Sequence, residues 1–294
     1  MQRLFHFTMI SSQTRALAII GDPIEHSLTP RIQNAAWRDK NIDIVNLAFR
    51  VAPDDLESAV KGARALGLLG LMVTIPHKEA VLALCDELDP SARSMGAANL
   101  LHFRPDGKTV GYSTDGWAAI KSLNEEGVSI GGARIAILGG GGAARSLALT
   151  WAQEGAAQIT ILNRTVTRAQ TIADEVTQLG IATRAAALDE VSLRQTIPET
   201  DILVNATSLG MHPNTGETPI ARAFLSSHLA VYDIVYNPLQ TRLLREAQEA
   251  GCKTIDGLGM LIYTNVRAAQ ICANEDISAT LMREEALRAL SSRT

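Results

Sequence analysis

A short apolar strand that leads directly into four glycines constrains the fold more than any other stretch of this sequence. The strand is predicted over residues 134–138, and the glycines occupy positions 139–142. Small and apolar residues then recur at helical spacing, and a second apolar run covers residues 158–162. This order of strand, glycine turn, helix and strand is typical of a βαβ unit in a parallel sheet.

The glycine turn fits the fingerprint of dinucleotide-binding domains. Gly139, Gly141 and Ala144 occupy the three small positions of that fingerprint. Backbone N–H groups that carry no side chain can approach a pyrophosphate closely at the positive N-terminus of the following helix. We therefore predict that this part of the chain binds a dinucleotide.

The turn after the second strand indicates which dinucleotide is bound. A domain specific for NAD usually carries Asp or Glu there, which accepts hydrogen bonds from the ribose 2′-hydroxyl. Here the strand ends at Asn163, and two arginines follow at positions 164 and 168. A guanidinium can hold a phosphate through two hydrogen bonds. We predict NADP(H), with NAD as the less favoured cofactor. The alternative interpretation is an ordinary solvated basic turn.

The composition bounds the class of protein and its partners. The chain has 294 residues, of which 46% are hydrophobic and 20% are charged, and its net charge is −4. It is long enough for two packed domains, and no basic surplus favours nucleic acid or a membrane surface as a partner. No apolar run is long enough to span a bilayer. The predicted partner is a small-molecule substrate, bound by a monomer or a homodimer.

The cysteines and histidines indicate neither a disulfide framework nor a metal site. Cys85, Cys252 and Cys272 are odd in number and far apart, which favours a reduced, cytoplasmic compartment. The histidines are not spaced as zinc ligands, so no metal is predicted. Residues 1–14 contain no apolar signal-peptide core and are expected to form a tail before the first strand.

The N-terminal part of the chain alternates between predicted strands and helices. Thr29 is expected to cap a helix that has Pro30 in its first turn. Pro76 is expected to begin another helix, which places Lys78 near a positive helix terminus that lowers the proton affinity of an amine. Such an amine suits acid–base chemistry. The predicted strands are residues 15–21, 46–51 and 69–74, followed by a hairpin of residues 99–103 and 109–112.

Strands and helices keep alternating beyond the glycine turn, as they do in a doubly wound sheet. An apolar helix over residues 260–273 has no strand after it, so we expect it to pack on the first domain. The predicted fold class is α/β with two domains. An α/β substrate domain, residues 1–116, is completed by C-terminal helices of residues 258–294. A Rossmann-like doubly wound NADP-binding domain comprises residues 117–257.

Eight motifs along residues 18–273 together resemble the shikimate dehydrogenase family. They follow one another in family order and cover nearly the whole chain, so their combination is far more specific than the glycine turn alone. The motifs are His26–Pro30, Val73–Lys78, Gly96–Asn99, Ser113–Gly116, Gly139–Ala144, Asn163–Thr165, Asn205–Ser208 and Gly257–Leu261.

The resemblance implies NADP-dependent interconversion of shikimate and 3-dehydroshikimate, a step of the chorismate pathway to aromatic amino acids. It implies that Lys78 is the catalytic acid–base residue and that Asp115 is its hydrogen-bonded partner. Ser27 and Thr29 match the hydroxyls that hold the substrate carboxylate. The other substrate positions match Thr74, Asn99, Asp115, Tyr236 and Thr264. The cofactor positions match Gly139, Gly140, Gly141, Gly142, Ala143, Asn163, Arg164, Thr165, Arg168, Thr207, Ile234 and Gly257.

Several residues depart from the family pattern. Met72 and Thr264 stand where the family usually has Asn and Gln, and Leu100 and Ser113 replace a Thr and an Asn. Methionine donates no hydrogen bond and threonine is shorter than glutamine, so two contacts to ring hydroxyls are expected to change. Met72 is alternatively a core residue at a strand end. The open alternatives are an enzyme for quinate or another hydroxylated ring acid, including one that uses NAD, and a catalytically weak NADP-binding sensor.

Overall fold

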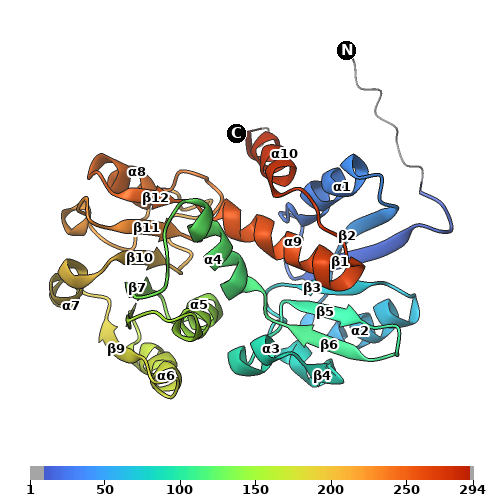
Figure 1. The fold of residues 1–294 in the computed structure, drawn as a ribbon, viewed down its shortest axis with the longest axis horizontal. Coiled ribbons are helices and arrows are strands. Elements are labelled where there is room, and N and C mark those ends of the chain that lie inside the picture. The colour runs from blue at the N-terminus through green and yellow to red at the C-terminus, as the bar shows by residue number, and fades with distance from the viewer. Residues whose placement is uncertain (1–9, 292–294) are drawn as a thin grey trace, which may run out of the picture. The chain divides into compact units, whose positions relative to one another are not determined.

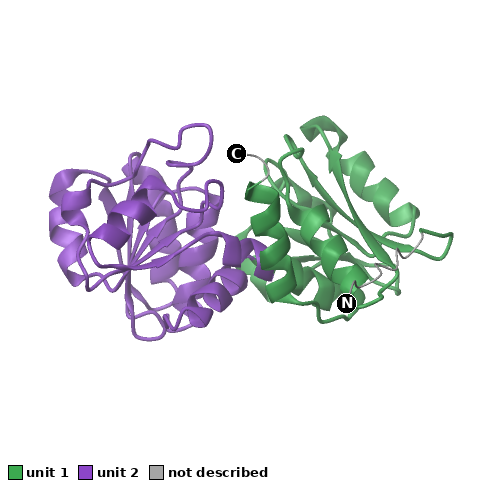
Figure 2. Ribbon diagram, turned by 90° about the horizontal axis from the view of Figure 1, so that it is seen from above, with its two compact units in different colours: residues 1–114, 264–294 green, residues 115–263 purple. Residues whose placement is uncertain are grey.

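The computed structural model describes residues 10–291, which form two compact units (Figure 2). Of these described residues, 10–114 and 264–291 belong to the first unit, and 115–263 form the second. Most of the predicted N-terminal tail, residues 1–9, lies outside the described residues. Within the described part of the chain, every helix is too short or too polar to cross a bilayer.

A six-stranded mixed sheet organises the first unit (Figure 1). Its strands are β1 (Arg15–Gly21), β2 (Ile44–Arg50), β3 (Gly70–Val73), β4 (Glu87–Leu88), β5 (Leu100–Phe103) and β6 (Thr109–Tyr112). Their order in the sheet is β2-β1-β3-β5-β6-β4; β1 is parallel to β2 and β3, and β5 is antiparallel to β3 and β6. The helices are α1 (Thr29–Asp39), α2 (Leu56–Ala65), α3 (Pro90–Met95) and α10 (Ala279–Ser291), with 3₁₀ helices η1 (Pro53–Asp55) and η2 (Ala80–Leu84).

Apolar side chains on both faces of β1 form the centre of the first unit. Leu17 and Ala18 point to opposite faces of this strand, and both are fully buried. A parallel strand that is buried on both faces needs a helical cover on each side of the sheet. Ile32 and Trp37 supply part of that cover, since both are fully buried in α1, which packs against β2.

The second unit contains a six-stranded sheet in which neighbouring strands are all parallel. Its strands are β7 (Arg134–Leu138), β8 (Gln158–Asn163), β9 (Ala182–Ala187), β10 (Ile202–Asn205), β11 (Ala230–Asp233) and β12 (Lys253–Ile255). Their order is β12-β11-β10-β7-β8-β9, so the chain first builds outward from β7 to β9 and then from β10 to β12 on the other side. Doubly wound sheets bind ligands at such a switch point, outside the carboxyl ends of the strands.

Helices connect the parallel strands of this sheet and flank it in the sequence (Figure 1). The connecting helices are α5 (Gly142–Gln153), α6 (Val166–Thr177), α7 (Glu190–Thr196) and α8 (Arg242–Glu249), with η3 (Ile197–Glu199) and η4 (Arg222–Phe224). Helix α4 (Asp115–Glu125) precedes β7, and α9 (Leu258–Ala273) follows β12. Helix α9 begins in the second unit, and its residues from Thr264 onward belong to the first. The predicted α/β class with two domains and C-terminal helices is confirmed.

Two local predictions were wrong. Thr29 is the first residue of α1 rather than its cap, and Leu28 takes the capping position without a side-chain hydrogen bond. Pro76 does not begin a helix either. Pro76 and Lys78 lie in an irregular turn, and the next helix, η2, begins only at Ala80. Hydrogen bonds to distant strands shape this turn, so the argument from a helix dipole does not apply to Lys78.

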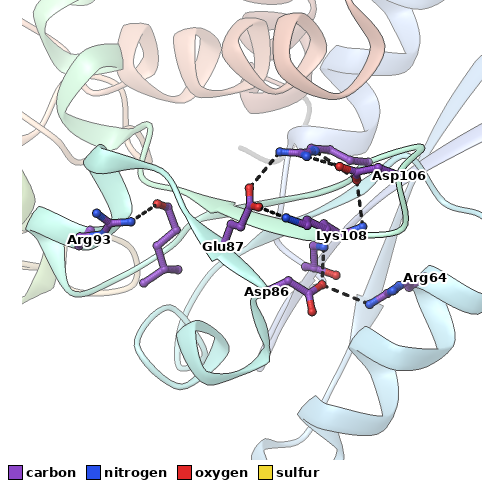
Figure 3. Close-up of polar contacts among 9 residues, drawn as sticks. Arg64, Asp86, Glu87, Arg93, Asp106 and Lys108 are labelled. Carbon is purple, nitrogen blue, oxygen red and sulfur yellow. Dashed lines mark hydrogen bonds and ion pairs between the residues drawn. The ribbon is translucent and has the colours of Figure 1, made fainter.

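Charged side chains surround β4, the two-residue strand at one edge of the first sheet (Figure 3). Glu87 of β4 pairs with Arg104 at 3.0 Å and also with Lys108. Arg64 of α2 pairs with Asp86 at 3.3 Å. A very short edge strand surrounded by charge discourages pairing with another chain, so we assign this cluster a structural role.

Candidate active site

Lys78 lies in a turn after β3 that is fastened to two other strands. The Thr74 N–H donates a hydrogen bond of 3.0 Å to the Ile20 carbonyl oxygen of β1. His77 is 1% exposed, and its Nε2 lies 2.8 Å from the carbonyl oxygen of Val51, just after β2. A carbonyl oxygen only accepts, so Nε2 of His77 carries the hydrogen. The backbone leading to Lys78 is therefore fixed by contacts far away in the sequence.

Gly21 lets this turn approach the end of β1. A Cβ atom at Gly21 would lie 2.5 Å from Cγ2 of Thr74, closer than real Cβ contacts, and a tight 3.1 Å from the carbonyl oxygen of Ile75. The Asp22 N–H donates to that same carbonyl oxygen over 3.0 Å. The close approach places Thr74, one of the predicted substrate residues, beside the end of the first strand.

Hydrogen bonds also link the Lys78 turn to the segment that leads to Asp115. The Ala98 N–H donates to the Lys78 carbonyl oxygen over 2.8 Å. The next residue, Asn99, accepts the Thr114 N–H at Oδ1 over 2.8 Å and donates from Nδ2 to Thr114 Oγ1 over 3.0 Å. Thr114 directly precedes Asp115, which is 7% exposed and begins α4. The first unit thus brings Lys78 close to Asn99 and fixes the residue before Asp115.

The two predicted carboxylate-binding hydroxyls lie together at the start of α1. The Thr29 N–H donates to Ser27 Oγ over 3.3 Å. Asn265 of α9 donates from Nδ2 to Thr29 Oγ1 over 3.4 Å. Its neighbour Thr264, another predicted substrate residue, is 8% exposed. Ser27, Thr29 and Thr264 are therefore brought to one region of the first unit.

Met72 belongs to a buried polar cluster that sequence reasoning missed. Gln33, which is fully buried in α1, donates from Nε2 to the Asn265 carbonyl oxygen over 3.1 Å and accepts Asn46 Nδ2 over 2.7 Å. Met72 is 6% exposed, and its sulfur lies 3.9 Å from Gln33 Nε2. Met72 is thus a core residue. Polar residues at buried positions of α1 and β2 were the signal that pointed to this cluster.

The first two glycines after β7 are required by close packing. Gly139 has φ +124°, and its N–H donates to the Leu162 carbonyl oxygen over 2.8 Å. A Cβ atom on Gly139 would lie 2.9 Å from the Ala206 carbonyl oxygen. A Cβ atom on Gly140 would lie 2.8 Å from Asn163 Nδ2. The turn therefore packs against the end of β8 and against Ala206, the residue that follows β10.

The next two glycines leave a helix N-terminus bare. Gly141 is the capping residue of α5, and Gly142 is its first residue. A Cβ atom on either would meet no other atom within 4 Å. Backbone N–H groups at the start of a 12-residue helix therefore border open space, into which the pyrophosphate of a dinucleotide fits. Ala143 follows in the same turn and is half-buried.

The predicted 2′-phosphate residues lie on the turn between β8 and α6. Asn163 donates from Nδ2 to the Thr165 carbonyl oxygen over 2.9 Å, which holds this turn in shape. Arg164, Thr165 and Arg168 are all exposed. Neither arginine forms an ion pair with a carboxylate of residues 10–291. Both guanidiniums are thus available to a phosphate.

A second buried polar cluster, also missed from the sequence, lies at the carboxyl ends of β10 and β11. Asn205, Asp233 and Thr241 are each 0% exposed. Asn205 and Asp233 directly end apolar strands, and that was the signal available in the sequence. Burial raises the pKa of Asp233 to about 6. The predicted cofactor residues Thr207 and Ile234 follow these strand ends.

Ile234 and Gly257 are also brought together in the second unit. A Cβ atom on Gly257 would lie 2.2 Å from the Ile234 carbonyl oxygen, so only glycine permits this contact. Tyr236 is half-buried in the same loop after β11. Asp115 and Tyr236 belong to the second unit, whereas Lys78 belongs to the first.

Two family models match the sequence. The one described as shikimate dehydrogenase substrate binding domain matches residues 19–101, and the one described as shikimate / quinate 5-dehydrogenase matches residues 121–235. A curated relative from Methanopyrus kandleri, a shikimate dehydrogenase (NADP(+)), is 44% identical over 284 residues. This match covers 96% of the present chain and 98% of the relative.

Solved structures agree with these matches over nearly the full length. A shikimate dehydrogenase in complex with NADP⁺ is 38% identical, with a TM-score of 0.89 and coverage of 96% of this chain and 98% of the other. The ligand-free 5-ketofructose reductase of Gluconobacter sp. strain CHM43 is 34% identical, with a TM-score of 0.86 and coverage of 95% and 100%. The chain belongs to the shikimate dehydrogenase family.

Proposed function

We propose that this protein interconverts 3-dehydroshikimate and shikimate with NADP(H). The observation that carries the proposal is the hydrogen-bonded path from the Lys78 carbonyl oxygen through Ala98 and Asn99 to Thr114. It holds the turn that carries the proposed acid–base lysine and the residue that precedes its proposed partner, Asp115. The names of the full-length relatives support the same substrate and cofactor.

The proposed chemistry divides between the two domains predicted from the sequence. Residues 1–116 with 258–294 supply most contacts to the ring acid, and residues 117–257 bind the dinucleotide and add Tyr236 to the substrate contacts. When bound, NADP(H) accepts or supplies the hydride at the ring carbon. The Lys78 ammonium gives a proton to the reacting ring oxygen, or its amine takes one from it, and Asp115 holds that amine in place. Such a positioned acid–base group contributes about 10² to 10⁴ in rate.

The other proposed substrate residues bind and orient the ring acid. Ser27 and Thr29 donate their hydroxyl hydrogens to the carboxylate, and the bond from the Thr29 N–H to Ser27 Oγ holds the Ser27 hydroxyl at the start of α1. The remaining residues hold the ring hydroxyls through side chains that donate and accept. They are Thr74, Asn99, Tyr236 and Thr264.

The proposed cofactor preference rests on the exposed turn after β8. Arg164 and Arg168 hold the 2′-phosphate, and Thr165 adds a hydroxyl donor. Gly139 to Ala143 surround the pyrophosphate, and Thr207, Ile234 and Gly257 supply further contacts to the dinucleotide. We place the enzyme in the cytoplasm as a monomer or a homodimer.

A second candidate function is the same redox step on a different hydroxylated substrate, such as quinate. Met72 is buried against Gln33, and Thr264 stands where the family usually has the longer Gln, so contacts to the ring hydroxyls differ. The match to a 5-ketofructose reductase indicates that this fold also accommodates other polyhydroxylated ketones. This candidate changes the substrate and leaves the role of Lys78 unaltered.

The test is a matrix of assays that follow nicotinamide absorbance. Shikimate, quinate and 5-ketofructose are each supplied with the matching redox form of NADP and of NAD. Highest kcat/KM for shikimate with NADP supports the proposal, and a higher value for another substrate selects the second candidate. Absence of turnover with every pair, together with retained NADPH binding, would make the protein a sensor instead.

A further inference from the structure

Asp233 places a carboxylate in the interior of the second unit, and no cationic side chain of residues 10–291 pairs with it. It is the last residue of β11 and is 0% exposed. Oδ1 accepts hydrogen bonds from Asn205 Nδ2 over 3.0 Å and from the Val235 N–H over 3.1 Å. Oδ2 accepts one from Thr241 Oγ1 over 2.7 Å. All three donors are neutral, so the carboxylate is satisfied by hydrogen bonds alone.

Asn205, the first of these donors, extends the cluster to the loop after β10. Asn205 Oδ1 accepts both the N–H of Thr207, over 3.0 Å, and the Thr207 hydroxyl, over 2.6 Å. Asn205 Nδ2 also donates to the Leu209 carbonyl oxygen over 3.2 Å. The bond that Asn205 Nδ2 donates to Asp233 fixes which way the Asn205 amide is turned, and this orientation lets Asn205 Oδ1 accept from Thr207.

The other two donors fix the loop after β11. The bond to Val235 N–H sets the backbone directly after Ile234, whose carbonyl oxygen packs against Gly257. Thr241 Oγ1 accepts the Leu244 N–H over 3.2 Å and so caps α8 at the far end of the same loop. One carboxylate therefore holds both ends of the loop that contains Ile234.

We propose that Asp233 is a positioning residue that holds the two loops carrying Thr207 and Ile234 in the shape that binds the dinucleotide. The proposal rests on the proposed function of those two residues as cofactor contacts. Asp233 itself contacts no reacting group. It acts through Asn205 and through the backbone of Val235.

The cost of burying Asp233 supports a role beyond folding. Burial raises the pKa of this carboxyl, because the charged form loses its hydration and gains no cation in return. An apolar residue at the end of an apolar strand would avoid that cost. Buried polar groups that are kept despite such a cost commonly fix one geometry among several.

The test compares variants of Asp233 and Thr241, the two residues joined by the 2.7 Å hydrogen bond from Thr241 Oγ1 to Asp233 Oδ2. Asp233→Asn keeps an oxygen for Asn205 but presents an amide to Thr241, so the Thr241 hydroxyl hydrogen loses its acceptor. Thr241→Val removes that hydroxyl, and Thr241→Ser keeps it. Asp201→Asn is the matched control, because Asp201 lies just before β10, at the opposite end of that strand, and pairs with Arg134 at 2.9 Å.

Two quantities are measured for each protein: the dissociation constant of NADPH without substrate, by fluorescence, and the melting temperature. We expect Asp233→Asn and Thr241→Val each to weaken NADPH binding about tenfold, the effect of one hydrogen bond to a charged group. The double variant should bind no more weakly than Asp233→Asn alone. Thr241→Ser should match the wild type, and Asp201→Asn should lower the melting temperature alone.

The proposal is overturned if Asp233→Asn and Thr241→Val lower the melting temperature and leave NADPH binding unchanged, as expected for Asp201→Asn. If Asp233→Asn does not fold, the NADPH dissociation constants of Thr241→Val and Thr241→Ser are compared instead. Equal values for these two variants would overturn the proposal. A wild type that binds NADPH but oxidises no shikimate contradicts the proposed function without touching this proposal. A wild type that binds no NADPH contradicts both.

Discussion

The side-chain amide of Asn99 binds both the backbone and the side chain of Thr114. Its Oδ1 accepts the Thr114 N–H over 2.8 Å, and its Nδ2 donates to Thr114 Oγ1 over 3.0 Å. Asn99 also follows Ala98, whose N–H donates to the Lys78 carbonyl oxygen. The neighbouring residues Ala98 and Asn99 therefore link the turn that carries Lys78 to the segment that leads to Asp115.

This relationship predicts that Thr114 matters for turnover although it has no proposed contact with substrate. Thr114→Val removes the hydroxyl and should lower kcat for shikimate by about 10- to 100-fold, because small displacements of catalytic groups have effects of that size. The KM for NADP should not change. Thr114→Ser keeps the hydroxyl and should retain turnover. Equal kcat values for the Val and Ser variants would show that the hydroxyl positions nothing.

The exposed arginines after β8 predict how the enzyme distinguishes its cofactors. Arg164→Ala and Arg168→Ala should each raise the KM for NADP about tenfold, because each removes a charged donor from the 2′-phosphate. The KM for NAD should stay unchanged, since NAD lacks that phosphate. Arg184→Ala, on the exposed edge strand β9, is the matched control and should affect neither cofactor. A parallel rise for NAD and NADP would argue against phosphate recognition.

Burial of Asp233 predicts a specific pH dependence of stability. Its pKa is about 6 in the folded protein against an ordinary value of 3.8, so the folded state binds this proton more tightly than the unfolded state. The contribution of Asp233 to stability is thus largest below about pH 4 and falls by about 3 kcal/mol as the pH rises through 6. Denaturant unfolding of the wild type and Asp233→Asn across this range measures it.

The difference in unfolding free energy between the wild type and Asp233→Asn reports the titration of this carboxyl separately from that of the other carboxyls. The unfolding free energy of Asp233→Asn minus that of the wild type should increase between about pH 4 and about pH 7. Above that range this difference should be constant. A constant difference over the whole range would mean that Asp233 titrates normally in the fold.

The glycine turn was predictable because its information is local. Strand β7, the glycines and helix α5 follow one another in the chain, and each has a clear pattern. The turn that carries Lys78 was predicted wrongly because its shape comes from elsewhere. Val51, Asp22 and Ala98 hydrogen-bond to its residues, and none of them is near it in sequence.

Other features lacked any pattern to read. Strand β9, Ala182–Ala187, was missed because alanine favours helices and because a half-exposed edge strand needs no apolar run. Gln33 and Asp233 were missed for a different reason. Each makes sense only through partners from other elements, Asn46 and Asn265 for the first and Asn205 and Thr241 for the second. The motifs identified the proposed catalytic residues but not the residues that hold them.

Reduction of NADP by shikimate, measured for Lys78→Ala beside the wild type, determines whether Lys78 is the acid–base residue. The matched control is Lys108→Ala, since Lys108 pairs with Glu87 on the surface of the same unit (Figure 3). We expect the wild type and the control to turn over equally. Lys78→Ala should lose at least about 100-fold in kcat and still bind NADPH. Turnover by Lys78→Ala at the wild-type rate would show that Lys78 is not the acid–base residue.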